Sequence, residues 1–259
     1  MLVTGASGGL GRAIASAFAD GGARVALGGR DRDRLTTLAR ELEARSGAGS
    51  RAGSGEERCR TVLLDVADGD ACAAAVAEVE RAWGGLDVLV NNAGIATSEP
   101  FLRLDDATWE RALAVNAGGP FRLTRAALPG MLARGWGRVI QIASTAALAG
   151  QARVAAYAAS KHALLGLTRS LAVEYAASGV TFNCVCPHFV AGSLTERTVA
   201  AIMERTGRSE EAARAPLQTP QGRLVQPEEV AAACLYLARD VAAAVNGQAI
   251  ALDGALRGS

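Results

Sequence analysis

The chain has 259 residues, of which half are apolar and a fifth are charged, as is typical of a globular protein. Its 27 basic and 26 acidic side chains give a formal charge of +1, which argues against a nucleic-acid partner. No apolar run approaches the roughly 20 residues of a membrane span, so we predict neither a membrane partner nor a signal peptide. The five cysteines lack paired metal-ligand spacing, so we expect reduced thiols, no metal site and a cytoplasmic location.

Short apolar runs alternate with alanine-rich stretches of helical spacing along the chain. Continuous apolar strands that alternate with helices indicate a mostly parallel sheet covered on both faces. We therefore predict an α/β fold, a single Rossmann-type domain over residues 1–259 with a doubly wound parallel sheet of about seven strands. The predicted strands are 2–3, 24–27, 61–64, 86–90, 138–142, 180–185 and 249–252, and the predicted helices are 10–20, 33–45, 70–83, 106–134, 154–177 and 227–239.

Two stretches interrupt this alternation. Residues 46–55 are rich in glycine and serine, and we interpret them as a flexible insertion within the domain. Residues 188–223 follow the sixth strand and contain a helical piece near 195–206. A long excursion at the carboxyl end of a parallel strand is where open α/β sheets build a substrate lid. We therefore predict a substrate-binding flap at 188–223.

The first predicted strand runs directly into a glycine-rich loop that opens a helix. Glycines let the backbone turn tightly and approach a pyrophosphate, and the free N–H groups of a helix start stabilise its charge. Such a loop alone is weak evidence, because many strand-to-helix turns merely tolerate glycine. Its place between the first strand and the first helix predicts dinucleotide binding. The predicted contact residues are Gly5, Ser7, Gly8, Gly9, Leu10 and Gly11.

The end of the second strand bears on which dinucleotide binds. In NAD-selective sites an acidic side chain near this point hydrogen-bonds the ribose 2′-hydroxyl. Here Gly29 holds that place beside Arg30, which would pair bidentately with a 2′-phosphate. We therefore predict NADP(H) in preference to NAD(H). The alternative is that Arg30 belongs to a solvated helix start, since residues 30–34 alternate in charge.

Tyr157 and Lys161 are four residues apart and so share one face of the predicted helix 154–177. A carbonyl that receives a hydride needs a proton on its oxygen, and a tyrosine can donate one if its pKa is lowered from about 10. The Lys161 ammonium and an oxidised nicotinamide would favour the phenolate and lower that pKa. Ser144, just past the fifth strand, could polarise the same substrate oxygen. Taken singly, these residues could also be surface neighbours on a helix and a turn residue.

Together these residues resemble the short-chain dehydrogenase/reductase family, and the resemblance runs nearly end to end. Residues 4–11 have the family's Thr-Gly-x-x-x-Gly-x-Gly pattern, residues 91–94 read Asn-Asn-Ala-Gly, and residues 157–161 read Tyr-x-x-x-Lys. The resemblance implies a catalytic tetrad of Asn116, Ser144, Tyr157 and Lys161. It implies cofactor contacts from Asp65, Val66, Asn92, Ala93, Gly94, Tyr157, Lys161, Pro187, Val190 and Ser193.

The resemblance also implies the reaction. It is that of an NAD(P)(H)-dependent enzyme that interconverts a carbonyl and a secondary alcohol by hydride transfer, with Tyr157 as acid and base. A proton relay would run from Tyr157 through the ribose hydroxyl and Lys161 to a water held by the Asn116 backbone. The family further implies a homotetramer, or a homodimer, built partly from the helices 106–134 and 154–177.

The chain departs from the family pattern at three positions. His188 follows Pro187 where the family has glycine, and Gly192 stands where a threonine normally bonds the nicotinamide carboxamide. Ser193 is the candidate replacement for that threonine. His188 either shapes the substrate pocket or faces solvent from a loop. Gly8 stands where many NADP-dependent members carry arginine or lysine, which leaves Arg30 to support the NADP(H) prediction.

Among family members, 3-oxoacyl thioester reductases and polyketide ketoreductases are the most similar, particularly in residues 222–230. We therefore predict reduction of a 3-oxoacyl thioester. One alternative is a free ketone or secondary alcohol: a hydroxyacyl-CoA, polyketide, steroid or aromatic compound. Another is a non-enzymatic, NADP-binding redox-sensing regulator, which the retained tyrosine and lysine argue against. Carrier-protein docking is doubtful, because Gly135 and Ser178 occupy the places where fatty-acid ketoreductases often carry arginine.

Overall fold

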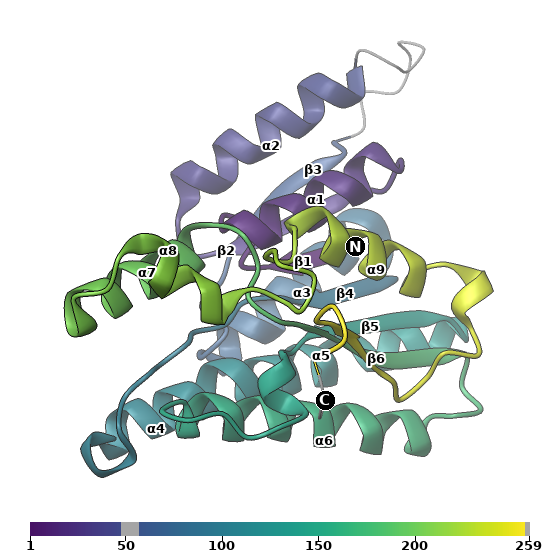
Figure 1. Ribbon diagram of the computed structural model, residues 1–259. Helices are drawn as coiled ribbons and strands as arrows, with labels where there is room; N and C mark the ends of the chain where they lie inside the picture. Colours follow the sequence, from purple (N-terminus) through teal and green to yellow (C-terminus); the bar gives the residue numbers. More distant parts are fainter. Residues whose placement is uncertain (48–56, 257–259) are drawn as a thin grey trace.

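The computed structural model describes residues 1–47 and 57–256, so most of the predicted insertion at 46–55 lies outside the described residues. Seven strands form one parallel sheet in the order β3-β2-β1-β4-β5-β6-β7. This confirms the predicted doubly wound sheet (Figure 1). The strands are β1 Leu2–Thr4, β2 Val25–Gly29, β3 Cys59–Leu63, β4 Val88–Asn91, β5 Gly137–Ile142, β6 Val180–Pro187 and β7 Ala249–Leu252.

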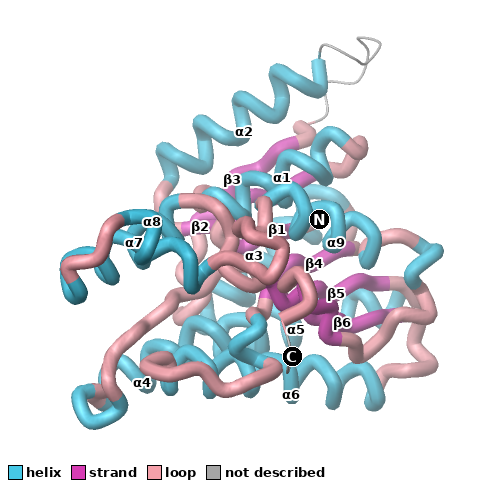
Figure 2. Tube along the Cα trace, in the orientation of Figure 1, coloured by secondary structure: helices cyan, strands magenta, loops and turns pink. Residues whose placement is uncertain are grey.

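Helices cover both faces of the sheet, as Figure 2 shows. One face packs against α1 (Gly9–Asp20), α2 (Arg32–Gly47) and α9 (Pro227–Leu237). The other packs against α3 (Gly69–Trp83), α5 (Gly119–Arg134) and α6 (Ala155–Glu174), and α4 (Asp106–Leu113) lies against α6. Two further helices, α7 (Ser193–Thr206) and α8 (Glu210–Arg214), follow β6 within the segment predicted as a flap.

The side chains of the central strands alternate between two large hydrophobic cores, one on each face of the sheet. In β2, Val25 and Leu27 belong to the core beneath α1, α2 and α9, whereas Ala26 belongs to the opposite core with Leu89 of β4. Both faces are buried, so neither face needs polar side chains. The strands therefore read in the sequence as continuous apolar runs.

The segment predicted as one helix, 106–134, is helical but not uniform. Asp105 caps the start of α4 by accepting the backbone N–H of Thr108 at 2.7 Å. A π turn at Ala114–Gly118 then joins α4 to α5. A π turn inserts an extra residue into a helix and changes the direction of the side chains there. This turn carries Asn116, which is completely buried.

Within the described residues, no helix is long and apolar enough to cross a membrane. Nor do three or more His, Cys, Asp or Glu side chains gather there in a way that could hold a metal ion. All five cysteines are buried free thiols.

Candidate active site

The loop after β1 is fastened to the loop after β4. The Thr4 hydroxyl oxygen accepts the backbone N–H groups of Asn92 at 3.0 Å and Ala93 at 2.9 Å. The side-chain amide of Asn92 donates to the Thr4 carbonyl oxygen at 2.9 Å. Asn92, predicted as a cofactor contact, therefore uses its side chain to position the glycine-rich loop. Thr4 joins the two loops, a role that its place in the motif does not reveal.

Close backbone approach explains two glycines of this loop. Gly5 has a φ of +65°, and a Cβ there would lie 3.0 Å from the Cα of Ala93. A Cβ on Gly11 would lie 2.2 Å from the Gly5 carbonyl oxygen, far inside van der Waals contact. The loop can therefore turn beneath α1 only with glycine at position 11.

The start of α1 fits the pyrophosphate of a dinucleotide. Within the described part of the chain, no side chain caps this helix end, and its first turn has no acidic residue. Free N–H groups at the positive end of a helix dipole bind phosphate. Gly8 and Gly9 are exposed here, between the half-buried Ser7 and Leu10. These residues would hold the pyrophosphate of a bound dinucleotide.

The residues predicted for the adenosine end follow β2 and β3. Arg30 is exposed and has no ion-pair partner within residues 1–47 and 57–256. Asp65 accepts the backbone N–H of Ala67 at 3.0 Å. Val66 is buried against α5, where a Cβ on Gly119 would lie 2.8 Å from the Val66 Cβ. Val66 thus packs against the fold as well as bordering the predicted adenine site.

Asn116 is anchored on all sides by hydrogen bonds. Its Oδ1 accepts the backbone N–H of Ile95 at 2.9 Å, and its Nδ2 donates to the Ile95 carbonyl oxygen at 2.9 Å. Nδ2 also donates to Ser160 Oγ at 2.9 Å, and Ser160 Oγ donates to the Tyr157 carbonyl oxygen at 2.7 Å. The π turn is therefore tied to both the loop after β4 and the start of α6. Ser160 completes this connection, and its only sequence signal is its place beside Lys161.

The other three predicted catalytic residues meet at the carboxyl end of β5. Ser144 caps a short 3₁₀ turn after β5, where its Oγ accepts the Ala146 N–H at 3.1 Å, and it also hydrogen-bonds Tyr157. The Lys161 ammonium is buried and donates to the Ile142 carbonyl oxygen at 2.7 Å. Its Nζ lies 5.8 Å from the centre of the Tyr157 ring.

Gly94 links this group to the glycine-rich loop. A Cβ on Gly94 would lie 3.1 Å from Asn116 Oδ1 and 3.6 Å from Lys161 Nζ. The Asn-Asn-Ala-Gly segment therefore runs from Thr4, beside the predicted pyrophosphate site, to the buried Asn116 and Lys161. The structure thus brings all four predicted catalytic residues together beside the place where a dinucleotide fits.

Burial dominates the electrostatics of the site. It raises the pKa of Tyr157 above its usual value, while the hydrogen bond with Ser144 acts in the opposite direction. Burial lowers the pKa of Lys161 to about 8, and the nearby Cys184 and Cys186 thiols oppose this shift. In the protein alone the net shift of the Tyr157 pKa is upward, because removal of the hydroxyl from water has the largest effect. The lowering expected from Lys161 together with an oxidised nicotinamide stays a prediction.

The segment predicted to contact the nicotinamide follows β6. Pro187 is buried at the end of that strand, and Val190 pairs with Val225 in an isolated bridge. Ser193, the candidate replacement for the family's threonine, is exposed at the first residue of α7. Thr195 is the buried threonine of this segment, and its hydroxyl donates to the Val190 carbonyl oxygen at 2.5 Å. Thr195 lies three residues beyond the position at which the family pattern has its threonine.

His188 is half-buried, with its Nδ1 3.3 Å from the Thr145 hydroxyl and its ring edge-on to Phe189. Of the two alternatives for this residue, a side chain that simply faces solvent is therefore wrong. The imidazole packs beside the residue that follows Ser144.

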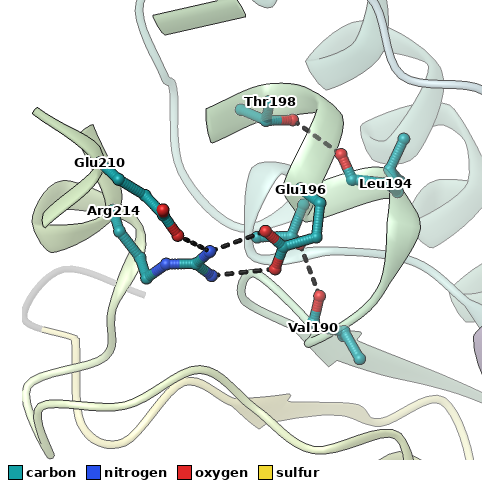
Figure 3. Close-up of polar contacts among 7 residues, drawn as sticks. Val190, Leu194, Glu196, Thr198, Glu210 and Arg214 are labelled. Carbon is teal, nitrogen blue, oxygen red and sulfur yellow. Dashed lines mark hydrogen bonds and ion pairs between the residues drawn. The ribbon is translucent and has the colours of Figure 1, made fainter. Parts of the chain in front are cut away.

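The segment predicted as a flap, called the flap below, has its own small core and its own ion pairs. Val199 of α7, Ala213 of α8 and Leu217 form a cluster separate from the sheet. Arg214 of α8 donates to both carboxylate oxygens of Glu196 in α7, at 2.9 and 2.7 Å, and to Glu210 at 2.8 Å (Figure 3). These contacts join the two helices to each other.

Comparisons with known proteins agree with this geometry. A family model described as enoyl-(acyl carrier protein) reductase matches residues 5–256. D-beta-hydroxybutyrate dehydrogenase of Rhizobium meliloti is 35% identical, over 98% of this chain and 96% of that protein. The 3-oxoacyl-(acyl-carrier-protein) reductase of Thermotoga maritima is 33% identical, over 98% and 96% of the two chains. A crystal structure of an F189W actinorhodin polyketide ketoreductase with NADPH superposes with a TM-score of 0.89, at 36% identity and with coverage of 98% and 95%.

The matches, the fold and the tetrad all indicate the same family. The chain belongs to the short-chain dehydrogenase/reductase family. It is an oxidoreductase of that family, and its relatives include dehydrogenases and reductases.

Proposed function

We propose that this oxidoreductase reduces the keto group of a 3-oxoacyl thioester to a secondary alcohol, with NADP(H) as the nicotinamide cofactor. The observation that carries the proposal is the meeting of Ser144, Tyr157 and Lys161 beside Gly94, next to a helix start shaped for a pyrophosphate. A thioester substrate is supported by the likeness to the Thermotoga maritima reductase and by residues 222–230.

The residues of the tetrad divide the chemistry. The Tyr157 hydroxyl donates a proton to the carbonyl oxygen during reduction and accepts it back during oxidation. The Ser144 hydroxyl, already hydrogen-bonded to Tyr157, donates to the same oxygen and stabilises the negative charge that develops there. Lys161 places a cation behind the tyrosine, which favours the phenolate. A nicotinamide cofactor, when bound, supplies or accepts the hydride.

Asn116 acts on the site through its neighbours. Its side chain is fully used by Ile95 and Ser160, so it fixes the loop after β4 relative to α6. Tyr157 and Lys161 both lie on α6, so this anchoring keeps their distance from the cofactor loop constant. Asn116 is therefore a positioning residue, which acts through Ile95 and Ser160.

The tyrosine gives the direct test. Tyr157→Phe removes the proton donor and keeps the ring, so we expect turnover to fall by about 10²–10⁴-fold while cofactor binding is retained. Turnover is followed by loss of the reduced-nicotinamide absorbance with acetoacetyl-CoA, and binding by cofactor fluorescence. A Phe variant as active as the wild type would refute the mechanism.

A wild type that binds the cofactor but turns over no carbonyl substrate would indicate the redox-sensing regulator. A wild type that reduces only simple ketones would indicate the free-ketone alternative.

The preference for NADP(H) depends on Arg30. Asp31 is occupied in capping α2, because its Oδ1 accepts the Arg34 N–H at 3.0 Å. Arg30 is exposed and available to a 2′-phosphate. We expect Arg30→Ala to raise the KM for NADPH about 10–100-fold with little change for NADH. Arg34→Ala removes a neighbouring exposed arginine and should change neither value; equal effects of both substitutions would point to a solvated helix start.

We also propose a cytoplasmic homotetramer, or a homodimer, built partly from α4, α5 and α6. Exposed apolar side chains on these helices support an interface: Trp109 on α4, Phe121 on α5 and Val173 on α6. Light scattering after size-exclusion chromatography measures the assembly, and a monomer at micromolar concentration would contradict it.

A further inference from the structure

A row of hydrogen-bonded polar side chains begins next to Ser144 of the tetrad. Gln151, in the loop before α6, donates from Nε2 to Thr145 Oγ1 at 3.4 Å. Thr145 Oγ1 lies 3.3 Å from His188 Nδ1. Thr145 directly follows Ser144, and His188 directly follows β6. Three separate segments thus place hydrogen-bonding groups next to the predicted carbonyl site.

Strand geometry places the imidazole at the rim of this site. Successive side chains of a strand alternate in direction, so Cys186 and His188 project to the same side. The Cys186 thiol lies against the backbone N–H of Ser144 and close to Tyr157. The extended pairing continues past the end of β6, because the His188 N–H donates to the Leu252 carbonyl oxygen at 3.0 Å. His188 therefore lies one pleat, roughly 6–7 Å, beyond the residue that contacts Ser144.

The hydrogen bonds define which imidazole nitrogen is available. Thr145 Oγ1 accepts from Gln151, so its own proton can be donated to His188 Nδ1. A neutral imidazole whose Nδ1 accepts a hydrogen bond carries its proton on Nε2. Burial lowers the pKa of His188, although Asp253 opposes this, so the neutral form is favoured. Within the described residues Nε2 has no partner and is not enclosed.

We propose that His188 is a specificity-determining residue whose Nε2–H donates a hydrogen bond to a second carbonyl oxygen of the substrate, that of the thioester, while Ser144 and Tyr157 bind the reacting keto oxygen. The assignment rests on the proposed function and adds the feature that the enzyme recognises, a 1,3-dicarbonyl compound. It also gives a reason for a side chain at a position where the family pattern has glycine. Asp253, buried just after β7, is the acidic residue whose charge opposes the lowering of the pKa of this imidazole.

A pair of substrates separates recognition from general damage to the site. His188→Leu should raise the KM for acetoacetyl-CoA about 10-fold with little change in kcat, because one hydrogen bond to the substrate is lost. A simple ketone without the second carbonyl should keep its kcat and KM. His188→Gln, whose amide nitrogen can occupy the place of Nε2, should return the thioester KM to within about 3-fold of wild type. Equal losses for both substrates would show that His188 only supports Thr145, and no loss for either would also refute the proposal.

Binding without turnover tests His188 independently of the reaction. The chain has two histidines, and His162 is exposed on α6, so nitrogen-15 NMR of the imidazoles contains its own control. In free protein we expect the Nε2–H tautomer at His188. Adding 3-hydroxybutyryl-CoA with NADPH, a pair that cannot react, should shift the His188 Nε2–H signal and leave His162 unchanged. An unchanged His188 signal would overturn the assignment. A shifted signal in an enzyme without thioester turnover would refute the proposed function and leave the recognition in place.

Discussion

The glycine-rich loop and the predicted flap both follow the carboxyl ends of parallel strands, but they are held in opposite ways. The loop at residues 5–11 is fixed by backbone contacts so close that a Cβ on Gly11 would lie 2.2 Å from a carbonyl oxygen. The flap helices α7 and α8 are joined by side chains, through the Arg214 ion pairs and a cluster around Val199. The loop leaves no room for a side chain at Gly5 and Gly11, whereas the flap helices are held by contacts that many side-chain pairs could provide.

This difference suits the ligand that each region is proposed to bind: the pyrophosphate at the loop and the substrate at the flap. A pyrophosphate is the same in every dinucleotide, so a site made of backbone N–H groups can be fixed once. Substrates vary, and a segment held by exchangeable side chains can change without disturbing the sheet. Placing the proposed thioester recognition at His188, where the flap segment begins, agrees with this division.

The largest effect should come from filling the loop. Gly11→Ala places a methyl group against the Gly5 carbonyl, so the loop or α1 must move. We expect a loss of about 3–5 kcal/mol in the free energy of unfolding and loss of cofactor binding. Urea denaturation and cofactor fluorescence measure the two effects.

Gly9→Ala is the matched control for this substitution. A Cβ on Gly9 would meet no described atom within 4 Å, at the first residue of α1. Its stability should stay at or slightly above that of the wild type, since alanine favours a helix. If Gly11→Ala bound the cofactor normally, the close backbone contacts would not be what fixes the loop, and the difference between loop and flap would be contradicted.

A second, smaller effect is the cost of burying Lys161. Its pKa falls from 10.5 to about 8 on folding, so between these pH values the unfolded chain binds more protons than the folded one. The free energy of unfolding should therefore gain from this group as pH rises through that window, by about 3 kcal/mol in all. Lys161→Met lacks this contribution. The stability difference between the two proteins, measured in urea from pH 7 to 10.5, should change by this amount; a constant difference would contradict the buried ammonium.

The smallest effect on global stability should come from the flap. Arg214→Met breaks the bonds to Glu196 and Glu210, which are exposed and so add little to overall stability. The thermal midpoint should hardly move, while cleavage within α7 by a protease specific for apolar residues should become several-fold faster. Arg205→Met is the control, because Arg205 has no ion pair in the described part of the chain. Equal cleavage of both variants would show that the ion pairs do not hold the flap.

Much of the fold can be predicted from the sequence, because the strands between the two edges of the sheet are buried on both faces. The predicted strand 249–252 coincides with β7, and 138–142 differs from β5 by one residue. The π turn at Ala114–Gly118 could not be predicted, because one inserted residue barely alters the helical spacing of 106–134. Helix α8 has five residues, too few to produce a periodic pattern.

The candidate site shows where sequence patterns stop being informative. Spacing and motif indicated Tyr157 and Lys161, and the structure places them together on α6. The bonds from Thr4 to Asn92 and from Asn116 to Ser160 depend on residues 44 to 88 positions apart, and no local pattern encodes them. The direction of the Tyr157 pKa shift depends on burial of its hydroxyl, which the sequence does not give.

The strand order also affects how the protein can be synthesised. The strands β4, β5, β6 and β7 join the same growing edge of the sheet in the order in which the ribosome produces them. Each new strand covers the hydrogen-bonding edge that the previous strand left open. Until Ala249–Leu252 has emerged, the edge of β6, every residue of which is buried in the finished protein, is open to pairing with other nascent chains. Ribosomes that stall shortly before that strand should therefore release chains that aggregate.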